Sequence, residues 1–260
     1  MTVKPVTPVP AATVILLREG HPGVQVLLMQ RARESKFAGG DYVYPGGKIE
    51  VDDNPDDAIG WCVGFDAAQA AARLRVPDAK TAVGCYVGAI RETFEEVGVL
   101  LAYDADGAWV RLEGLRWAEY RRATDKDNKA FWTMVKEENL RLATDRLVYF
   151  AHWITPEEQP YRYDTRFFAA PMPDHQAPVQ DEREVIDLRW FAPKAALAAF
   201  KAGAISLRNP TVQNMKLVDA DSVAAALAGV KDRDIPTIRP RVITENGQRK
   251  ILMPGDAGWF

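Results

Sequence analysis

Three glutamates stand within five residues of one another in the stretch RETFEEVGVL, residues 91–100. If this stretch is helical, Glu92, Glu95 and Glu96 share one face, because side chains three and four positions apart are neighbours on a helix. Like charges in this arrangement repel one another unless a cation compensates them. Carboxylate oxygens are ligands that Mg²⁺ and Mn²⁺ prefer, so one interpretation is a divalent-cation site. The other is a solvated helix face that binds nothing.

The apolar residues around the glutamates predict which way the helix faces. Ile90, Phe94 and Val97 fall at i, i+4 and i+7, which is typical of a stripe that packs on a core. A step of about 100° per residue then places the glutamates on the opposite, solvent-facing side. Gly98 is a natural stop, and we expect the helix to begin near Gly84.

Composition limits the classes of function. The chain has 260 residues with 47% hydrophobic content, enough to bury a substantial core. Its net charge of -3 provides no overall basic field, so we expect no nucleic-acid partner. A basic cluster is interleaved with aspartates and is interpreted as a solvated helix face; it comprises Arg121, Arg122, Lys126 and Lys129.

Cysteine and histidine usage points to a reducing environment without structural zinc. Cys62 and Cys85 are too few for a disulfide framework, which predicts a cytoplasmic protein. His21, His152 and His175 are widely separated and lack zinc-finger spacing. The apolar run at residues 11–17 is far too short to span a membrane, so no membrane partner is expected. The sequence leaves two oligomeric states open, a monomer and a homodimer.

Strand and helix patterns alternate irregularly along the chain. Strand character is strongest at residues 12–17, 24–31, 42–50, 147–154, 163–172 and 184–193. Helical patterns occupy residues 66–76, 116–142 and 194–203 in addition to the glutamate helix. Neither a P-loop nor a dinucleotide fingerprint nor a nucleophile elbow is present. The mixture favours an α+β fold in one domain with helical insertions.

A family resemblance rests on two segments. GGKIEVDD, residues 46–53, followed by RETFEEVGV resembles the Nudix box, a loop–helix–loop motif. Three features depart from the box: Asp53 replaces a glutamate, Thr93 replaces an aliphatic residue, and 37 residues, 54–90, separate Asp53 from Arg91. A looped-out excursion costs little closure entropy if its ends stay adjacent. The matching positions are Gly47, Arg91, Glu92, Glu95, Glu96, Gly98 and Val99.

The interrupted box is similar to that of the Nudix branch containing peroxisomal coenzyme A diphosphatases. LLMQRARESKFAGGDYVYPGG, residues 27–47, looks like a degenerate form of the segment before the box in such enzymes, and the resemblance spans roughly residues 10–200. It implies a mixed β-sheet sandwiched between helices in one Nudix hydrolase domain over residues 1–260. The expected additions are an insertion at about 54–83, a helical insertion at about 116–142, and a C-terminal helical extension at about 205–260.

The resemblance also implies roles for particular residues. Glu92, Glu95 and Glu96, with a carbonyl of Gly46 or Gly47, would hold Mg²⁺ or Mn²⁺. Arg91 would position the loop carboxylates, with Asp53 or Glu50 as its partner. The catalytic residues would be Arg91, Glu95 and a glutamate from outside the box, for which Glu184 is the first candidate and Glu182 its competitor. Substrate would be bound by Arg31, Lys36 and Tyr44.

The implied activity is divalent-metal-dependent hydrolysis of a diphosphate linkage in a small-molecule nucleoside diphosphate derivative. Coenzyme A or an acyl-coenzyme A is the first expectation, with Arg31 and Lys36 meeting the 3′-phosphate of coenzyme A. Two alternatives stay open. One is a pyrophosphatase for ADP-ribose or another nucleoside-diphosphate sugar, and the other is a non-catalytic nucleotide-binding regulator.

Overall fold

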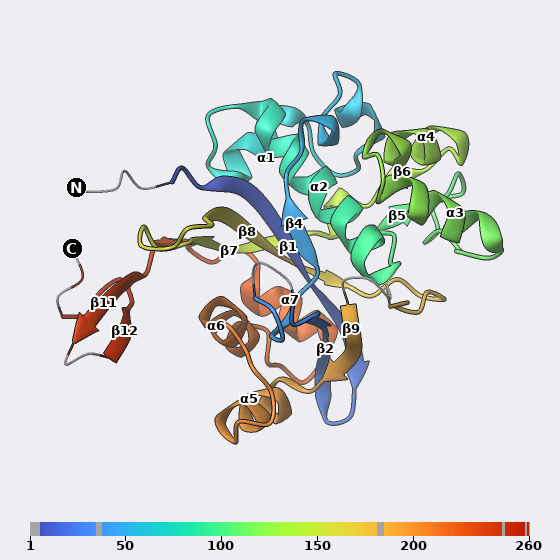
Figure 1. Ribbon diagram of the computed structural model, residues 1–260. Coiled ribbons are helices and arrows are strands. Elements are labelled where there is room, and N and C mark those ends of the chain that lie inside the picture. The colour runs from blue at the N-terminus through green and yellow to red at the C-terminus, as the bar shows by residue number, and fades with distance from the viewer. Residues whose placement is uncertain (1–5, 35–37, 181–184, 246–247, 258, 260) are drawn as a thin grey trace.

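A mixed eight-stranded sheet lies between two groups of helices (Figure 1). The computed structural model describes residues 6–34, 38–180, 185–245, 248–257 and 259. The strand order is β10-β7-β8-β1-β2-β3, with β4 paired to β1 and β9 paired to β2. The predicted α+β architecture, a mixed sheet sandwiched between helices, is confirmed. The strands of this sheet are β1 (Val9–Gly20), β2 (Gly23–Arg31), β3 (Tyr42–Val43), β4 (Gly46–Lys48), β7 (Val148–Ile154), β8 (Tyr163–Pro171), β9 (Val185–Phe191) and β10 (Thr237–Ile238).

The helices divide between the two faces of the sheet (Figure 1). One face carries α1 (Ala67–Leu74), α2 (Ala79–Val97), α3 (Leu115–Thr124) and α4 (Lys129–Glu137). The other carries α5 (Pro193–Lys201), α6 (Asn209–Leu217) and α7 (Val223–Val230). Within the described ranges, none of these helices combines the length and apolar character needed to cross a bilayer. Short 3-10 turns lie at η1 (Val51–Asp53), η2 (Ala58–Trp61) and η3 (Thr144–Arg146).

The central strand β1 is buried on both faces because its middle is a continuous apolar run. Successive side chains of a strand point to opposite faces. Val14 and Leu16 therefore pack in the core beneath α2, whereas Ile15 and Leu17 pack in a second core beneath α6 and α7. β1 runs parallel to β8 and antiparallel to β2 and β4. Two separate cores thus fix β1 as the strand against which the other elements are placed.

The glutamate helix α2 begins earlier than its sequence predicts. Asp78 caps its N-terminus by accepting hydrogen bonds from the amides of Lys80 and Thr81 at 3.2 and 2.7 Å. The expected start near Gly84 is therefore wrong by about one turn and a half, and the last residues of the 54–83 insertion belong to α2. The helix ends as predicted at Gly98, which takes the left-handed conformation at φ +66°.

The C-terminal extension is only partly helical. After α6 and α7 the chain forms β10 at the edge of the sheet and then a hairpin of β11 (Arg241–Glu245) and β12 (Gln248–Leu252). This hairpin forms a two-stranded sheet of its own and projects beside the main sheet (Figure 1). A second small sheet pairs β5 (Ala102–Tyr103) with β6 (Arg141–Leu142), the latter after α4 in the 116–142 insertion.

Candidate active site

The glycine pair before the insertion lies directly against α2. Gly46 adopts φ +150°, and its amide donates a 2.7 Å hydrogen bond to Oε2 of Glu96. A Cβ on Gly47 would stand 2.5 Å from the carboxylate of Glu92, so a larger residue here would have to displace the end of that side chain. The two halves of the motif are therefore in contact although 37 residues, 54–90, lie between Asp53 and Arg91.

Arg91 and Asp53 form a buried ion pair across the insertion. The Nε of Arg91 donates to Oδ1 of Asp53 at 2.5 Å and its Nη2 donates to Oδ2 at 3.0 Å. Their side chains are only 2% and 1% exposed. The Nη2 group also donates to the carbonyl of Lys48 at 3.0 Å. Of the two expected partners, Asp53 makes the pair, whereas Glu50 contributes a backbone amide that donates to Asp53 at 2.8 Å.

Arg91 also contacts Glu92 and Glu95. We did not expect the contact with Glu92, because adjacent residues on a helix point in directions about 100° apart. Nη1 of Arg91 lies 3.0 Å from Oε1 of Glu92 and 2.8 Å from Oε2 of Glu95. The side chains of Glu92 and Glu95 are 14% and 13% exposed, and that of Glu96 is 12% exposed. The prediction of a solvent-facing acidic face is therefore wrong. Gly46 and Gly47 lie against Glu96 and Glu92, and Arg91 lies against Glu95.

Burial changes the proton affinity of these carboxyl groups. Desolvation raises the pKa of Glu95 to about 8 and that of Glu92 to about 6, and the nearby Arg91 guanidinium opposes both shifts. Burial alone would lower the pKa of Arg91, but Asp53 and the two glutamates raise it above its ordinary value. Arg91 therefore stays charged and compensates part of the acidic cluster.

The donor set suits a hard divalent cation. Oε1 of Glu95 is buried and has no hydrogen-bond partner among the described residues, so an oxygen ligand is left over after Arg91 is satisfied. Glu92, Glu95 and Glu96 offer only oxygen atoms, as Mg²⁺ and Mn²⁺ prefer. Within the described ranges no three acidic, histidine or cysteine side chains already converge on one point. A bound cation would therefore require the carboxylates to turn toward one another.

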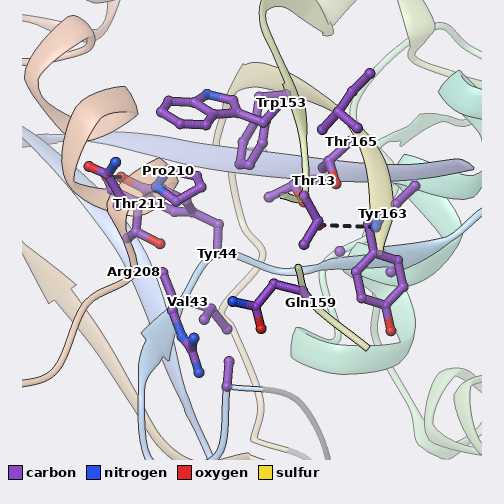
Figure 2. Close-up of a pocket in the computed structure, with 18 of the residues that line it drawn as sticks. Thr13, Val43, Tyr44, Trp153, Gln159, Tyr163, Thr165, Arg208, Pro210 and Thr211 are labelled. Atoms are coloured by element: carbon purple, nitrogen blue, oxygen red, sulfur yellow. Dashed lines mark hydrogen bonds between the residues drawn. The ribbon is translucent and has the colours of Figure 1, made fainter. Parts of the chain in front are cut away.

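A cavity of about 460 Å³ opens beside Glu92 and Glu96. Its floor is the α6 side of the sheet, and Figure 2 shows residues of β1, β3, β7, β8 and the start of α6 around it. Gly46, Gly47 and Lys48 of β4 line the end next to the glutamates. The cavity is thus continuous with the acidic cluster and large enough to admit part of a nucleotide-sized ligand.

The predicted substrate-binding residues have different surroundings. Nη1 of Arg31, at the end of β2, lies 3.5 Å from Oε1 of Glu96 and borders the cavity. Tyr44 also lines the cavity but is only 3% exposed, and burial raises the pKa of its hydroxyl. Lys36 lies outside the described residues, as do both candidates for the general base, Glu184 and Glu182.

Arg121 has a role that the sequence interpretation missed. Its Nε and Nη2 donate to the carbonyls of Glu95 and Glu96 at 2.8 and 2.9 Å, which caps the last turn of α2. The interpretation as part of a solvated basic face is therefore wrong for this residue. The sequence did contain a signal for this role. Trp117, Arg121 and Thr124 are spaced so that they share one face of a helix. In the structure Trp117 and Thr124 on this face are buried.

The other missed residues come from the C-terminal half of the chain. Arg208, which precedes α6, lines the cavity and forms an ion pair with Asp41. Trp153 of β7 and the hairpin residues Val242 and Ile251 also border it. No motif relates these positions to the box, so only the folded chain brings them to the site.

The fold and the interrupted box define a Nudix hydrolase domain. The family described as "NUDT19 Nudix domain" matches residues 76–218, more than half of the chain, and the chain belongs to this Nudix family. A crystal structure of a Nudix hydrolase from Alicyclobacillus acidocaldarius is similar in fold, with a TM-score of 0.73 over 88% of this chain and 99% of that one. The two are 22% identical.

Curated relatives carry the name acyl-coenzyme A diphosphatase NUDT19. The protein from Xenopus laevis is 26% identical over 72% of this chain, and that from Gallus gallus is 27% identical over 76%. The alignments span 57% and 65% of those two proteins. The human protein of the same name is 25% identical over 90% of this chain and 72% of its own length.

Proposed function

We propose that this protein hydrolyses the diphosphate linkage of a nucleoside diphosphate derivative with Mg²⁺ or Mn²⁺, and that coenzyme A or acyl-coenzyme A is its substrate. The observation that carries the proposal is the closure of the interrupted box, with Gly47 against Glu92 and Arg91 paired to Asp53. The names of the NUDT19 relatives support the choice of substrate. Water would attack one phosphorus atom and the bridging P–O bond would break.

The residues of α2 would have two roles in this reaction, to bind the cation and to position its ligands. Glu92, Glu95 and Glu96, with a carbonyl of Gly46 or Gly47, would hold the cation, which when bound supplies charge neutralisation and activation of water. Arg91 holds two of the three carboxylates by their Oε atoms, and the Gly46 amide holds the third. These contacts keep the three carboxylates beside one another, and binding of the cation would still require their oxygens to turn toward it.

The general base is proposed to come from outside α2, because carboxylates that hold a cation are poor proton acceptors. Glu184 remains our first candidate and Glu182 the second. Val185, the residue after Glu184, stands opposite Arg31 in the pairing of β9 with β2, and Arg31 borders the cavity. Comparing E184Q with E182Q decides between them, since only the variant that lacks the base should lose kcat while still binding substrate.

A product-resolved assay tests the proposed function. Coenzyme A, dodecanoyl-coenzyme A, ADP-ribose and a dinucleoside polyphosphate would each be incubated with the enzyme and Mg²⁺ or Mn²⁺. We expect phosphopantetheine or its acyl form, together with adenosine 3′,5′-bisphosphate, from the first two. Preferential cleavage of ADP-ribose would replace the coenzyme A assignment by the pyrophosphatase alternative. Binding of a nucleotide with no turnover of any substrate would favour the regulator.

A further inference from the structure

The end of the cavity distant from the glutamates is mostly apolar, although Thr155 and Gln159 also line the cavity there. Six residues form this surface, which we call the hairpin wall: Trp153, Ile154, Pro156, Pro240, Val242 and Ile251. By contrast, Arg31, Lys48, Glu50, Glu92 and Glu96 gather at the box end of the same cavity. A ligand that fills the whole cavity would therefore have one charged end and one apolar end.

Strand register gives the length of the cavity floor. Lys48 of β4 pairs with Ala11 of β1, which pairs with Thr165 of β8, which in turn pairs with Trp153 of β7. Three strand spacings of about 4.8 Å separate β4 from Trp153, a span of about 14 Å. A diphosphate held beside Glu92 therefore needs a long substituent to reach the wall.

The outer part of the wall comes from the C-terminal hairpin. Val242 and Ile251 are direct partners across β11 and β12, so their side chains share one face of the hairpin. Ile251 is 51% exposed, so much of its aliphatic surface is available to a ligand in the cavity. The hairpin is fixed near the β7–β8 connection by the Val242 amide, which donates to Oε2 of Glu158 at 3.3 Å.

The chemistry of the wall favours an aliphatic chain over a nucleobase. Only Trp153 in this set has a polar side-chain atom, and its Nε1 already donates to Oδ1 of Asn214 at 3.2 Å. Thr155 and Gln159 of the adjoining β7–β8 connection also line the cavity, but the six wall residues themselves offer a base no side-chain hydrogen-bonding group that is not already paired. A hydrocarbon chain needs no such group, and it would remove Ile251 from water.

We propose that the hairpin wall binds the acyl chain of acyl-coenzyme A, so that Val242 and Ile251 set the preference of the enzyme for chain length. This inference rests on the proposed function, because it presumes a diphosphate bound at the box end. Each methylene group that the wall buries should lower the dissociation constant of the substrate about fourfold. Wild-type kcat/KM should therefore rise from coenzyme A through hexanoyl- to dodecanoyl-coenzyme A and then level off.

The test compares V242S/I251S with the matched control I243S. Ile243 lies on β11 beside Val242 but does not line the cavity, so its replacement changes the same hairpin without changing the wall. In V242S/I251S we expect the ratio of kcat/KM for dodecanoyl-coenzyme A to that for coenzyme A to fall about tenfold. The rate with coenzyme A itself should stay within about twofold, and I243S should keep the wild-type ratio.

The outcomes separate this inference from the proposed function. If wild-type enzyme cleaves coenzyme A but shows no dependence on chain length, the wall assignment is overturned and the function stands. An equal loss with coenzyme A and its acyl esters in V242S/I251S would also overturn it, because the wall would then contact the shared part of the substrates. If coenzyme A and its esters are all left intact, the proposed function fails and this inference fails with it.

Discussion

The guanidinium of Arg91 binds the carboxylate of Asp53 through two hydrogen bonds in the interior of the protein. Gly88, one turn earlier on α2, leaves the space for this contact, since a Cβ there would stand 2.8 Å from Oδ2 of Asp53. The pair joins the segment before the insertion to the helix after it. The excursion between them is itself packed against α2, since Ala70 and Leu74 of α1 are buried in the same core as Ile90 and Phe94.

Replacing Asp53 by asparagine should destabilise the fold. The change leaves Arg91 buried without its bidentate partner, and breaking a buried pair costs about 3–5 kcal/mol. For a chain of this size such a loss lowers the melting temperature by roughly 10 °C, measurable by calorimetry. D52N is the matched control, since the neighbouring Asp52 is partly exposed, and we expect it to melt like wild type. A D53N protein as stable as wild type would mean that the pair does not hold the box together.

Glu96→Gln should abolish hydrolysis while leaving the fold intact. The glutamine oxygen can still accept the hydrogen bond from the Gly46 amide, but one charge of the cation site is lost. In wild type, a cation present at a hundred times its Kd stabilises the protein by about 2.7 kcal/mol. The rise in melting temperature on adding MgCl₂ should therefore largely vanish in E96Q.

The exposed Glu119 on α3 supplies the control for this experiment. E119Q should keep both the activity and the stabilisation by Mg²⁺. Near-normal turnover of E96Q at saturating Mg²⁺ would show that the cation is held elsewhere.

The local patterns of the sequence predicted the parts of the site that depend on a single helix. Ile90, Phe94 and Val97 do face the core, and Gly98 does end α2, because helical periodicity and glycine capping are local effects. The predicted start of α2, near Gly84, was too late because the capping role of Asp78 was not recognised. Aspartate is a favourable residue at the N-cap of a helix. Burial of the glutamates was also missed, since it depends on how β4 packs and not on α2.

Arg121 positions the glutamates by holding the carbonyls of their own residues. R121A should destabilise the protein by about 2 kcal/mol, the range for hydrogen bonds to a charged donor. It should also lower kcat/KM by tenfold to a hundredfold, because a shift of about 1 Å in catalytic groups has that effect. R121K should recover only part of the loss, since one ammonium cannot reproduce two donors held in a fixed plane.

R122A is the control for the capping role, because Arg122 is the exposed neighbour on the same helix. Its stability and activity should match wild type. If R121A and R122A behaved alike, Arg121 would be an ordinary surface cation.

The remaining parts of the site depend on contacts between distant segments, which no local pattern encodes. Trp153, Arg208 and Val242 reach one cavity from a strand, a helix start and a hairpin that lie far apart in the chain. Their side chains are ordinary for their elements, so nothing in composition or spacing distinguishes them. The predicted helical extension likewise gave no indication of the hairpin that forms the cavity wall.

Arg31 provides a test of how the substrate is oriented. From the sequence we expected Arg31 to meet the 3′-phosphate of coenzyme A. Its guanidinium lies 3.5 Å from Glu96, at the cation end of the cavity, and this position favours a contact with the diphosphate instead. R31A should then lower kcat/KM for coenzyme A and for dephospho-coenzyme A by the same factor, roughly tenfold to a hundredfold for one charge-assisted contact. Steady-state kinetics with both substrates measures the two factors. Wild-type enzyme that favours coenzyme A, combined with an R31A variant that has lost this preference, would instead assign Arg31 to the 3′-phosphate.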